Sequence, residues 1–310
     1  MKHQPPRPAG KIASLKWSGC SDVGKVRANN EDSFLGLQFD AREIFRLGKF
    51  GKASLEKNDF AFAVCDGMGG AKAGEYASHI AAEKITTLLP RAFHQSASGM
   101  DTGFADVLTE LFTQVHLALA YLGNSYEECQ GMQTTMSLCW FTPGWMYFGH
   151  IGDSRIYHIP KRRKTIKQLT QDDTHVGWLF RNGKINEREA RMHPRRNTLQ
   201  RALGGGNQFV DPQVGAIACE RGDIFLLCTD GLVEGLFNSQ LAELSRKSQS
   251  SRTASNPARL LVDTSVTNSG RDNTTALVVK WSESKSAGDK KTAPVVTFVN
   301  NRRSARLFRS

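Results

Sequence analysis

Three apolar stretches of the sequence each lead into an aspartate that lies beside a glycine. Asp66 follows DFAFAVC, Asp153 follows MYFGHIG, and Asp230 follows DIFLLCT. An Asp next to a Gly is common in turns, and each of these alone is most simply a turn residue. Their recurrence favours a second interpretation, because strands of a sheet sandwich end at common rims where carboxylates can converge.

Three more acidic residues stand at the ends of expected elements: Glu31 and Asp32 in VRANNEDS, and Asp272 in GRDNTTALVV. Converged carboxylates repel one another, and a bound cation relieves that repulsion. Oxygen ligands without a His or Cys cluster favour hard cations such as Mg²⁺ or Mn²⁺. The glycines after Asp66 let the backbone, including the Gly67 carbonyl, approach such an ion closely. The sequence therefore predicts a carboxylate metal site.

Other motifs fail on their details. GMGGAKAG follows an expected strand, but Lys72 occupies the third glycine position of a dinucleotide loop, and Asp66 would repel a pyrophosphate. The sequence has no GKS or GKT, so a Walker loop is excluded. Met68 stands where an aspartyl-phosphate enzyme usually has its second Asp, and no HExxH zinc motif occurs.

Helices and antiparallel strands must position these carboxylates. One helix is predicted over 103–123, with apolar residues on a single stripe. A second, with Ala77, Ala81 and Ile85 at helical spacing, is expected to end at Pro90. A helical segment at 174–194 carries the capping-box pair Asn186 and Glu189. The stripe of the first helix comprises Phe104, Val107, Leu108, Leu111, Phe112, Val115, Leu119 and Leu122.

Strands account for most of the remaining apolar runs, among them TTMSLCWF, WMYFGHIG, RIYHIP, IFLLC and TALVVKW. Short turns such as FTPGW join several of them, which indicates antiparallel hairpins rather than parallel crossovers. Hairpins flanked by long amphipathic helices predict an α+β fold in which helices pack outside sheets.

Size and composition set broader limits. The chain has 310 residues, a formal net charge of +11 and six cysteines without zinc-like spacing, which read as core residues in a reducing compartment. The basic surplus favours acidic partners or is simply a basic surface. No signal peptide and no membrane span is expected, so cytoplasm is the predicted location. Residues 1–13 and the basic tail 283–310 are expected to be flexible, around one domain at 14–282.

Eight motifs, in order, resemble the metal-dependent protein phosphatases of the type 2C (PPM) family, especially its bacterial branch. They are SDVGKVRANNEDS, AVCDGMGGAKAGEYAS, GMQTTMSL, GHIGDSRIY, LTQDDTHV, GKINEREARMHPRRNTLQRALGG, DIFLLCTDGL and GRDNTTALVV. The resemblance runs from about residue 17 to 281. It implies a single four-layer α-β-β-α sandwich of two antiparallel sheets flanked by helices.

The resemblance also implies roles for individual residues. Asp66 would bridge two Mn²⁺ or Mg²⁺ ions, with Gly67 giving its carbonyl and with Asp230 and Asp272 completing one site. Glu31 would serve the other ion through water, supported by Asp32. Asp153 would help to hold a third, weaker metal. Arg27 would bind the substrate phosphate, and Asn273 would support the site. The implied reaction is hydrolysis of phosphoserine and phosphothreonine by a metal-activated hydroxide, without a phosphoenzyme.

Two departures from the family pattern stand beside these matches. Met68 replaces a His that is proposed as general acid in many eukaryotic members, which leaves protonation of the leaving group to water. Gln133 replaces a frequent Gly. Residues 172–205 match the segment called the flap, where Arg195, Arg196 and Arg201 either receive acidic substrates or are merely solvated.

The implied partners are phosphorylated proteins and the Ser/Thr kinases that the enzyme would oppose, with the chain acting as a monomer. A non-catalytic pseudophosphatase that binds phosphoproteins is the alternative, although no metal carboxylate is missing. A nucleic-acid binder would use the basic surplus, but the sequence lacks an aromatic-basic recognition motif.

Overall fold

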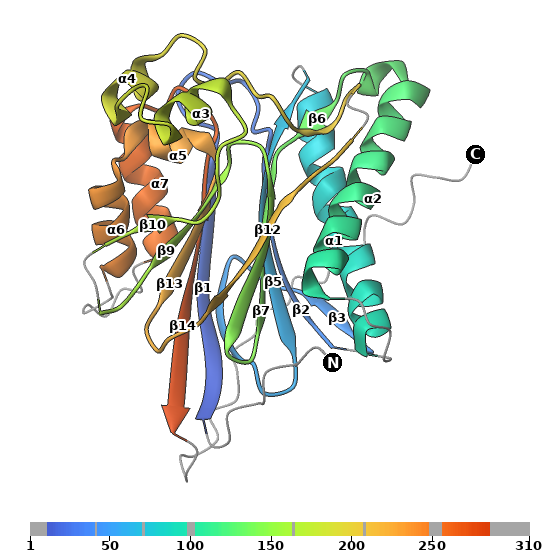
Figure 1. The fold of residues 1–310 in the computed structure, drawn as a ribbon, viewed down its shortest axis with the longest axis vertical. Coiled ribbons are helices and arrows are strands. Elements are labelled where there is room, and N and C mark those ends of the chain that lie inside the picture. The colour runs from blue at the N-terminus through green and yellow to red at the C-terminus, as the bar shows by residue number, and fades with distance from the viewer. Residues whose placement is uncertain are drawn as a thin grey trace.

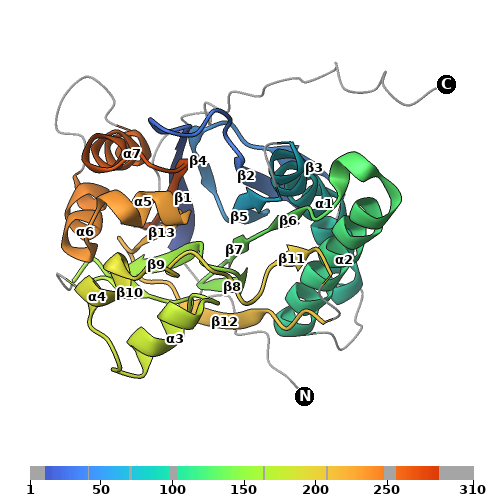
Figure 2. The ribbon, with the colours of Figure 1, turned by 90° about the horizontal axis from the view of Figure 1, so that it is seen from above.

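Two antiparallel β-sheets are stacked face to face, and helices cover their outer faces (Figures 1 and 2). The structure is a computed structural model that describes residues 11–40, 42–69, 72–97, 103–162, 165–206, 209–247 and 256–285. The predicted α+β class and the four-layer α-β-β-α sandwich are confirmed.

The first sheet contains six strands within the described residues, and each neighbouring pair is antiparallel. Their order is β10 (Lys167–Gln168), β9 (Arg155–Ile159), β13 (Ile224–Cys228), β14 (Thr274–Lys285), β1 (Lys11–Asp22) and β4 (Phe50–Ser54). Its outer face is covered by α5 (Asp230–Gly235), α6 (Asn238–Arg246) and α7 (Pro257–Asn268).

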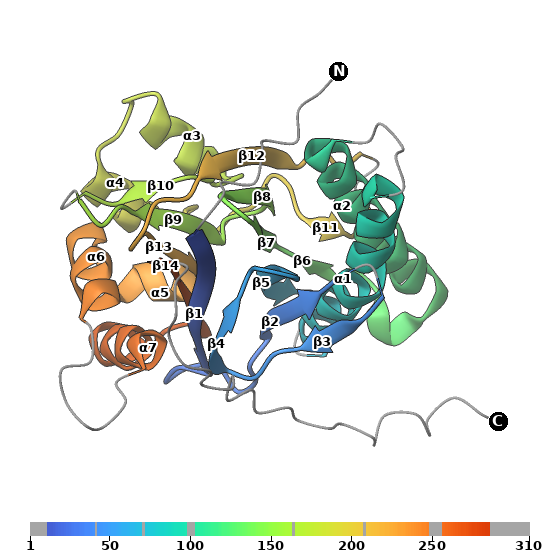
Figure 3. The same ribbon diagram turned by 90° about the horizontal axis from the view of Figure 1, so that it is seen from below.

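The second sheet has eight strands in the described part of the chain, again all antiparallel. Its main path is β11 (Leu203–Gly204), β6 (Gln133–Thr134), β5 (Asp59–Met68), β7 (Met136–Thr142), β8 (Trp145–Ile151) and β12 (Gln213–Ala218). β2 (Asp32–Phe39) also pairs with β5 and carries β3 (Ile44–Arg46). Helices α1 (Ala73–Ala97) and α2 (Phe104–Ser125) cover this sheet, as the view from below shows (Figure 3).

Strand alternation divides the interior into three apolar layers. In β5, Ala61, Ala63 and Cys65 belong to the cluster under α1 and α2. Phe60, Phe62 and Val64 belong instead to the cluster between the two sheets. The opposite faces of a strand therefore serve two different cores. A third cluster lies between the six-stranded sheet and helices α5 to α7.

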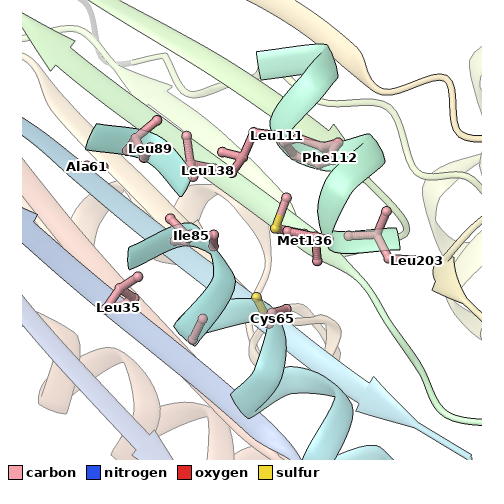
Figure 4. Packing of buried hydrophobic residues seen from close by; sticks show 14 of the residues in the cluster. Leu35, Ala61, Cys65, Ile85, Leu89, Leu111, Phe112, Met136, Leu138 and Leu203 are labelled. Atoms are coloured by element: carbon pink, nitrogen blue, oxygen red, sulfur yellow. The ribbon is translucent and has the colours of Figure 1, made fainter. Parts of the chain in front are cut away.

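The predicted stripe of α2 is confirmed. Leu111 and Phe112 are buried against Leu138 and Met136 of the sheet (Figure 4). The predicted end of the preceding helix is wrong, because α1 continues through Pro90 to Ala97. A proline inside a helix removes one backbone hydrogen bond. The buried stripe of α1, which includes Ala77, Ala81 and Ile85, stabilises the helix up to that point.

The two terminal strands, β1 and β14, extend into the segments that the sequence predicts to be flexible. β1 and β14 pair along twelve residues, from Lys11 opposite Lys285 to Asp22 opposite Thr274. Each strand supplies the other's hydrogen bonds, so the paired region begins before residue 14 and ends after residue 282. The rest of the predicted flexible segments, 1–10 and 286–310, lies outside the described residues. Among those residues, no helix is long and apolar enough to cross a membrane.

Candidate metal centre

Asp32 and Asp66 lie opposite each other at one end of the second sheet, in register as neighbours on β2 and β5. Along β5 the even-numbered residues Phe62 and Val64 face the space between the sheets. Because side chains alternate, Asp66 continues that face. Phe34 of β2 packs against the same inter-sheet cluster, so Asp32 shares its orientation. The sequence thus directs two carboxylates into the gap between the sheets.

The remaining predicted aspartates come from the ends of strands at the same rim. Asp153 lies in the turn between β8 and β9, and Asp230 is the first residue of α5, two residues after β13. Asp272 lies two residues before β14 begins. The register explains their convergence, because Cys228 at the end of β13 pairs with both Arg155 and Ala276.

Electrostatic coupling shows that these side chains share one region. Burial raises the pKa of Asp66 well above its ordinary value, and the charges of Asp32, Asp230, Asp153 and Asp272 raise it further. The pKa of Asp230 is raised well above its ordinary value by burial and then by Asp153, Asp272 and Asp32. Residues separated by more than 200 positions therefore repel one another across a single site.

Asp32 is the most enclosed member of the group. Its Oδ2 accepts hydrogen bonds from Thr229 Oγ1 at 2.8 Å and Thr275 Oγ1 at 2.7 Å. Thr275 lies in β14 and Thr229 directly follows β13, both in the six-stranded sheet, whereas Asp32 lies in the eight-stranded sheet. These hydrogen bonds therefore link the two sheets. Its Oδ1 is buried and has no hydrogen-bond partner among the residues that the structure describes. Burial raises the pKa of Asp32 to about 7 even though the two threonine hydrogen bonds lower it.

Two glycines make room beside Glu31. A Cβ at Gly67 would lie 1.9 Å from the Gly74 carbonyl oxygen, and a Cβ at Gly74 would lie 2.8 Å from Glu31 Oε2. Neither position tolerates a side chain without a shift of the backbone or of Glu31. Gly67 N also donates to the Glu31 carbonyl oxygen at 3.2 Å. The glycine-rich segment after Asp66 therefore brings Glu31 and the Gly67 backbone together.

The donors fit a hard divalent cation. In the described ranges, no group of three or more His, Cys, Asp or Glu side chains is arranged to hold a metal ion as it stands. The site nevertheless offers only oxygen donors, a buried and unpartnered Oδ1 of Asp32, and several carboxylates that raise one another's pKa. A cation among them would relieve both the repulsion and the missing interaction.

Arg27 and Asn273 lie where the sequence predicts support for this site. Arg27 Nη2 donates to Asp272 Oδ2 at 2.8 Å, while about half of its side chain (52%) stays exposed. Asn273 accepts from Glu31 N at 2.8 Å through Oδ1. Its Nδ2 donates to the carbonyl oxygens of Val23 at 3.0 Å and Asn29 at 2.9 Å. Asn273 therefore fixes the loop that carries Arg27 and Glu31.

The flap, residues 172–205, contains α3 (His175–Arg181) and α4 (Glu187–Met192). The predicted capping box of α4 is confirmed by both of its hydrogen bonds, from Glu189 N to Asn186 and from Asn186 N to Glu189. Two of the three flap arginines singled out from the sequence form ion pairs. Arg196 binds Glu234 of α5 and Arg201 binds Asp173, each at 2.5 Å, whereas Arg195 is exposed.

Five residues that order the rim were not predicted from the sequence: Arg155, Asp172, Asp173, Thr229 and Thr275. Asp173 accepts from Gly152 N at 3.0 Å, directly beside Asp153. Arg155 holds Asp172 with hydrogen bonds of 2.6 to 3.1 Å. The sequence did offer a signal for three of them, because Asp172 and Asp173 form the acidic pair of LTQDDTHV and Arg155 is the arginine of GDSR. The threonines that bind Asp32 gave no such signal, because their partner lies roughly two hundred residues away.

His150 lies behind the Asp153 turn and is fully buried. One ring nitrogen, Nδ1, lies 2.8 Å from Ser137 Oγ, and Nε2 lies 3.0 Å from the Gly152 carbonyl oxygen. A neutral ring that donates from Nε2 and accepts at Nδ1 satisfies both contacts. Burial lowers the pKa of His150 below its ordinary value, against the opposing charges of Asp173 and Asp172.

We expect the contribution of His150 to the free energy of unfolding to fall as the pH drops below about 6.5, the ordinary pKa of histidine, so that wild type and His150→Gln differ in how their stability changes with pH. The folded-state pKa of His150 is lowered, so the unfolded chain takes up the proton first, and stability is lost down to the folded pKa. Denaturant titrations at pH 7.5 and 5.5 would measure this, with His150→Gln as the comparison. Equal losses in both proteins would assign the pH dependence to other groups.

Comparison with known proteins agrees with this geometry. The family model for protein phosphatase 2C matches residues 49–263. The serine/threonine protein phosphatase PstP of Mycobacterium tuberculosis is 30% identical over 267 residues, which cover 85% of this chain and 44% of that protein. The serine/threonine phosphatase stp of Listeria monocytogenes is 29% identical over 262 residues, or 84% of this chain and 93% of that protein.

A solved structure extends the comparison to three dimensions. The catalytic domain of PstP in complex with two manganese ions matches with a TM-score of 0.67 and 27% identity, covering 87% of this chain and 99% of that one. The chain therefore spans less than half of the M. tuberculosis relative but matches nearly all of the solved PstP catalytic domain. Since the family model covers well over half of the sequence, the chain belongs to the bacterial branch of the protein phosphatase 2C (PPM) family.

Proposed function

We propose that this chain hydrolyses phosphoserine and phosphothreonine in phosphoproteins, in a reaction that depends on Mn²⁺ or Mg²⁺. The observation that carries the proposal is the convergence of carboxylates from both sheets on one rim, where they raise one another's pKa. Two further observations support it. The relatives are Ser/Thr phosphatases, and the matching PstP domain contains two manganese ions.

The residues that would hold the cations are those of the rim. Asp66 is central, because four other aspartates influence its pKa. Gly67, Asp230 and Asp272 would complete one position, and Glu31 would serve the other through water, supported by Asp32. Asp153 would hold a weaker third ion. When bound, such cations activate a water molecule as the nucleophile and neutralise charge on the phosphoryl oxygens.

The chain's own side chains then bind and orient the substrate. Arg27 presents a planar, exposed guanidinium at the rim, which suits bidentate contact with a phosphoryl group. Asp272 orients that guanidinium, and Asn273 fixes the loop behind it. Thr229 and Thr275 hold Asp32 so that Oδ1 remains available to the site. In this arrangement the protein mainly positions charge, as phosphoryl transfer requires.

The direct test is phosphate release from a phosphoserine peptide and a phosphothreonine peptide. The purified chain is assayed with Mn²⁺, with Mg²⁺ and with EDTA. We expect turnover in either cation and none in EDTA, with recovery when Mn²⁺ is restored. Undiminished turnover in EDTA would overturn the proposal. Binding of the phosphopeptide without turnover in any cation would instead support the pseudophosphatase alternative.

Arg27→Met is expected to lower kcat/KM about tenfold or more, since hydrogen bonds to charged groups are each worth about 1.5–3 kcal/mol. The loss should be similar for a phosphopeptide and a small aryl phosphate, because both present the same phosphoryl group. Steady-state kinetics on both substrates would measure it. The exposed Arg259→Met on α7 serves as the control, and an equal loss there would remove the role of Arg27.

Phosphorylated proteins are the substrates that the relatives' names imply, and Ser/Thr kinases would supply those substrates. Action as a monomer in the cytoplasm, without nucleic acid, stays a prediction from the sequence. Size-exclusion chromatography with light scattering would test the monomer.

A further inference from the structure

One arginine of the flap helix α4 is inserted into the end of the helix that begins with Asp230. Arg191 Nη1 donates to the Val233 carbonyl oxygen at 2.7 Å, and Nη2 donates to the Leu236 carbonyl oxygen at 3.1 Å. The guanidinium lies over the ring of Phe237, with Cζ 4.1 Å from the ring centroid. One side chain thus makes three contacts with the C-terminal end of α5.

The chemistry of that end explains why an arginine suits it. α5 has only six residues, Asp230–Gly235, and the chain turns extended at Leu236. The last carbonyl groups of a helix lack intrahelical partners and carry partial negative charge. A planar cation with several donors can bind two such carbonyls and stack on an aromatic ring at once. The Arg191 side chain is only 23% exposed, and Glu187 Oε1 accepts from its Nη2 at 3.2 Å.

The flap is attached to the rim at two points, one at its start and one on α4. At its start, Asp173 N donates to the Gly152 carbonyl oxygen at 2.7 Å, and Gly152 N donates back to Asp173 Oδ2 at 3.0 Å. Gly152 directly precedes Asp153. Further along, Arg191 binds α5, whose first residue is Asp230. Figure 1 shows α3 and α4 at the same end of the molecule as α5. The flap therefore connects the segments that carry two of the candidate metal ligands.

We propose that Arg191 is a positioning residue that holds α4 against α5 and thereby fixes the surface on which protein substrates rest. The inference rests on the proposed phosphatase function. A small aryl phosphate needs only the carboxylates and Arg27 at the rim. A phosphoprotein is larger and would also contact the elements around the rim. Its binding would therefore depend on the position of the flap.

The test compares Arg191→Met with Arg188→Met in the full chain. Both substitutions remove one arginine from α4, but the Arg188 side chain is exposed and makes no hydrogen bond or ion pair within the described residues. The first measurement is hydrogen exchange of the amides of residues 187–192. We expect Arg191→Met to speed their exchange about tenfold or more, the usual worth of a charged hydrogen bond, without changing exchange in β5 or β13.

The second measurement is kinetic. In Arg191→Met we expect KM for a phosphoprotein to rise, by up to about tenfold if the open position of α4 becomes the main population, while kcat for an aryl phosphate stays unchanged. Arg188→Met should match the wild type in both respects. Arg191→Lys, which keeps the charge but not the planar fork, should recover part of the phosphoprotein KM.

Faster amide exchange across the whole chain, or the same changes in exchange rate and KM in Arg188→Met, would overturn the proposal in favour of a general effect on stability. Local exchange with an unchanged phosphoprotein KM would overturn the positioning role alone. If the wild type shows no phosphatase activity, the proposed function fails, while the exchange data still report whether Arg191 holds α4. Arg191→Gln replaces Arg191→Met if the latter does not fold.

Discussion

Asp66→Asn is expected to lower kcat/KM for a phosphopeptide by at least about a hundredfold at saturating Mn²⁺. Even residues that only support metal ligands typically contribute 10–100-fold, and Asp66 lies closer to the centre than a supporting residue does. Four other aspartates influence its pKa, which places it among them all. An amide preserves its shape and removes its charge, so the loss would reflect weaker cation binding rather than altered packing.

The measurement is steady-state kinetics across a Mn²⁺ titration, together with calorimetry of Mn²⁺ binding. A higher Mn²⁺ concentration should recover part of the activity if the variant binds the ion more weakly. Asp263→Asn is the matched control, because Asp263 lies on the exposed surface of α7 with a side chain that is 59% accessible. A variant at position 66 with wild-type activity and wild-type Mn²⁺ affinity would contradict the proposed centre.

The location of the carboxylates could be predicted because the signal is local. Each of Asp66, Asp153 and Asp230 follows an apolar strand, and strand ends of a sandwich meet at a rim. The alternation of side chains along a strand then decides which face of the sheet Asp66 lies on. Val64 and Phe62, two and four positions earlier, are buried between the sheets, so Asp66 faces the same gap. The fold class followed from the same periodicities and from the short hairpin turns.

The hydrogen bonds that hold those carboxylates could not be predicted from the sequence. Thr229 and Thr275 bind Asp32 across the gap between the sheets, and a threonine beside a strand has no pattern that names its distant partner. The flap arginines show the same limit. A run of basic residues predicts a charged surface, whereas Arg196 and Arg201 are in fact held by Glu234 and Asp173. Such pairings depend on tertiary packing that no local spacing encodes.

The course of α1 shows a different reason for error. Pro90 is a correct local signal for the end of a helix, because proline removes a backbone donor. The helix nevertheless continues to Ala97. Its earlier turns are fixed by residues such as Ile85 and Leu89, which are completely buried under α2 and the sheet. Packing of an amphipathic face contributes more to helix stability than propensity does, so the local signal did not decide the outcome.

The carboxylate rim also predicts that a variant lacking one of its carboxylates is more stable than the wild type without metal. Asp153→Asn is expected to raise the melting temperature in EDTA at pH 8. Burial, and then the charge of Asp172, raise the pKa of Asp153 from 3.8 to about 7 in the folded chain. Between these two values the folded state keeps a proton that the unfolded chain has lost. Stability is therefore lost as the pH rises through this window.

An asparagine does not titrate and so avoids that loss. At pH 8 the variant should exceed the wild type in free energy of unfolding by on the order of 4 kcal/mol, since each unit of the shift in the Asp153 pKa is worth about 1.4 kcal/mol. A chain of this size gains roughly 2–4 °C in melting temperature per kcal/mol. At pH 5 the advantage should be much smaller, because the wild-type carboxyl is still largely protonated when folded. Thermal unfolding in EDTA at pH 5 and pH 8 would measure both values, with Asp263→Asn as the control.

Saturating Mn²⁺ should shrink or reverse the advantage of Asp153→Asn, because a ligand that binds only the folded state stabilises it in proportion to its affinity. The wild type keeps the carboxylate that would favour the ion, and the variant does not. A stability gain that is the same at both pH values, or that persists unchanged in Mn²⁺, would show that burial and acidic neighbours do not destabilise the ionised form of Asp153. For a carboxylate that binds a divalent ion, the stability advantage of Asp153→Asn must grow when the carboxyl loses its proton and shrink when the cation binds.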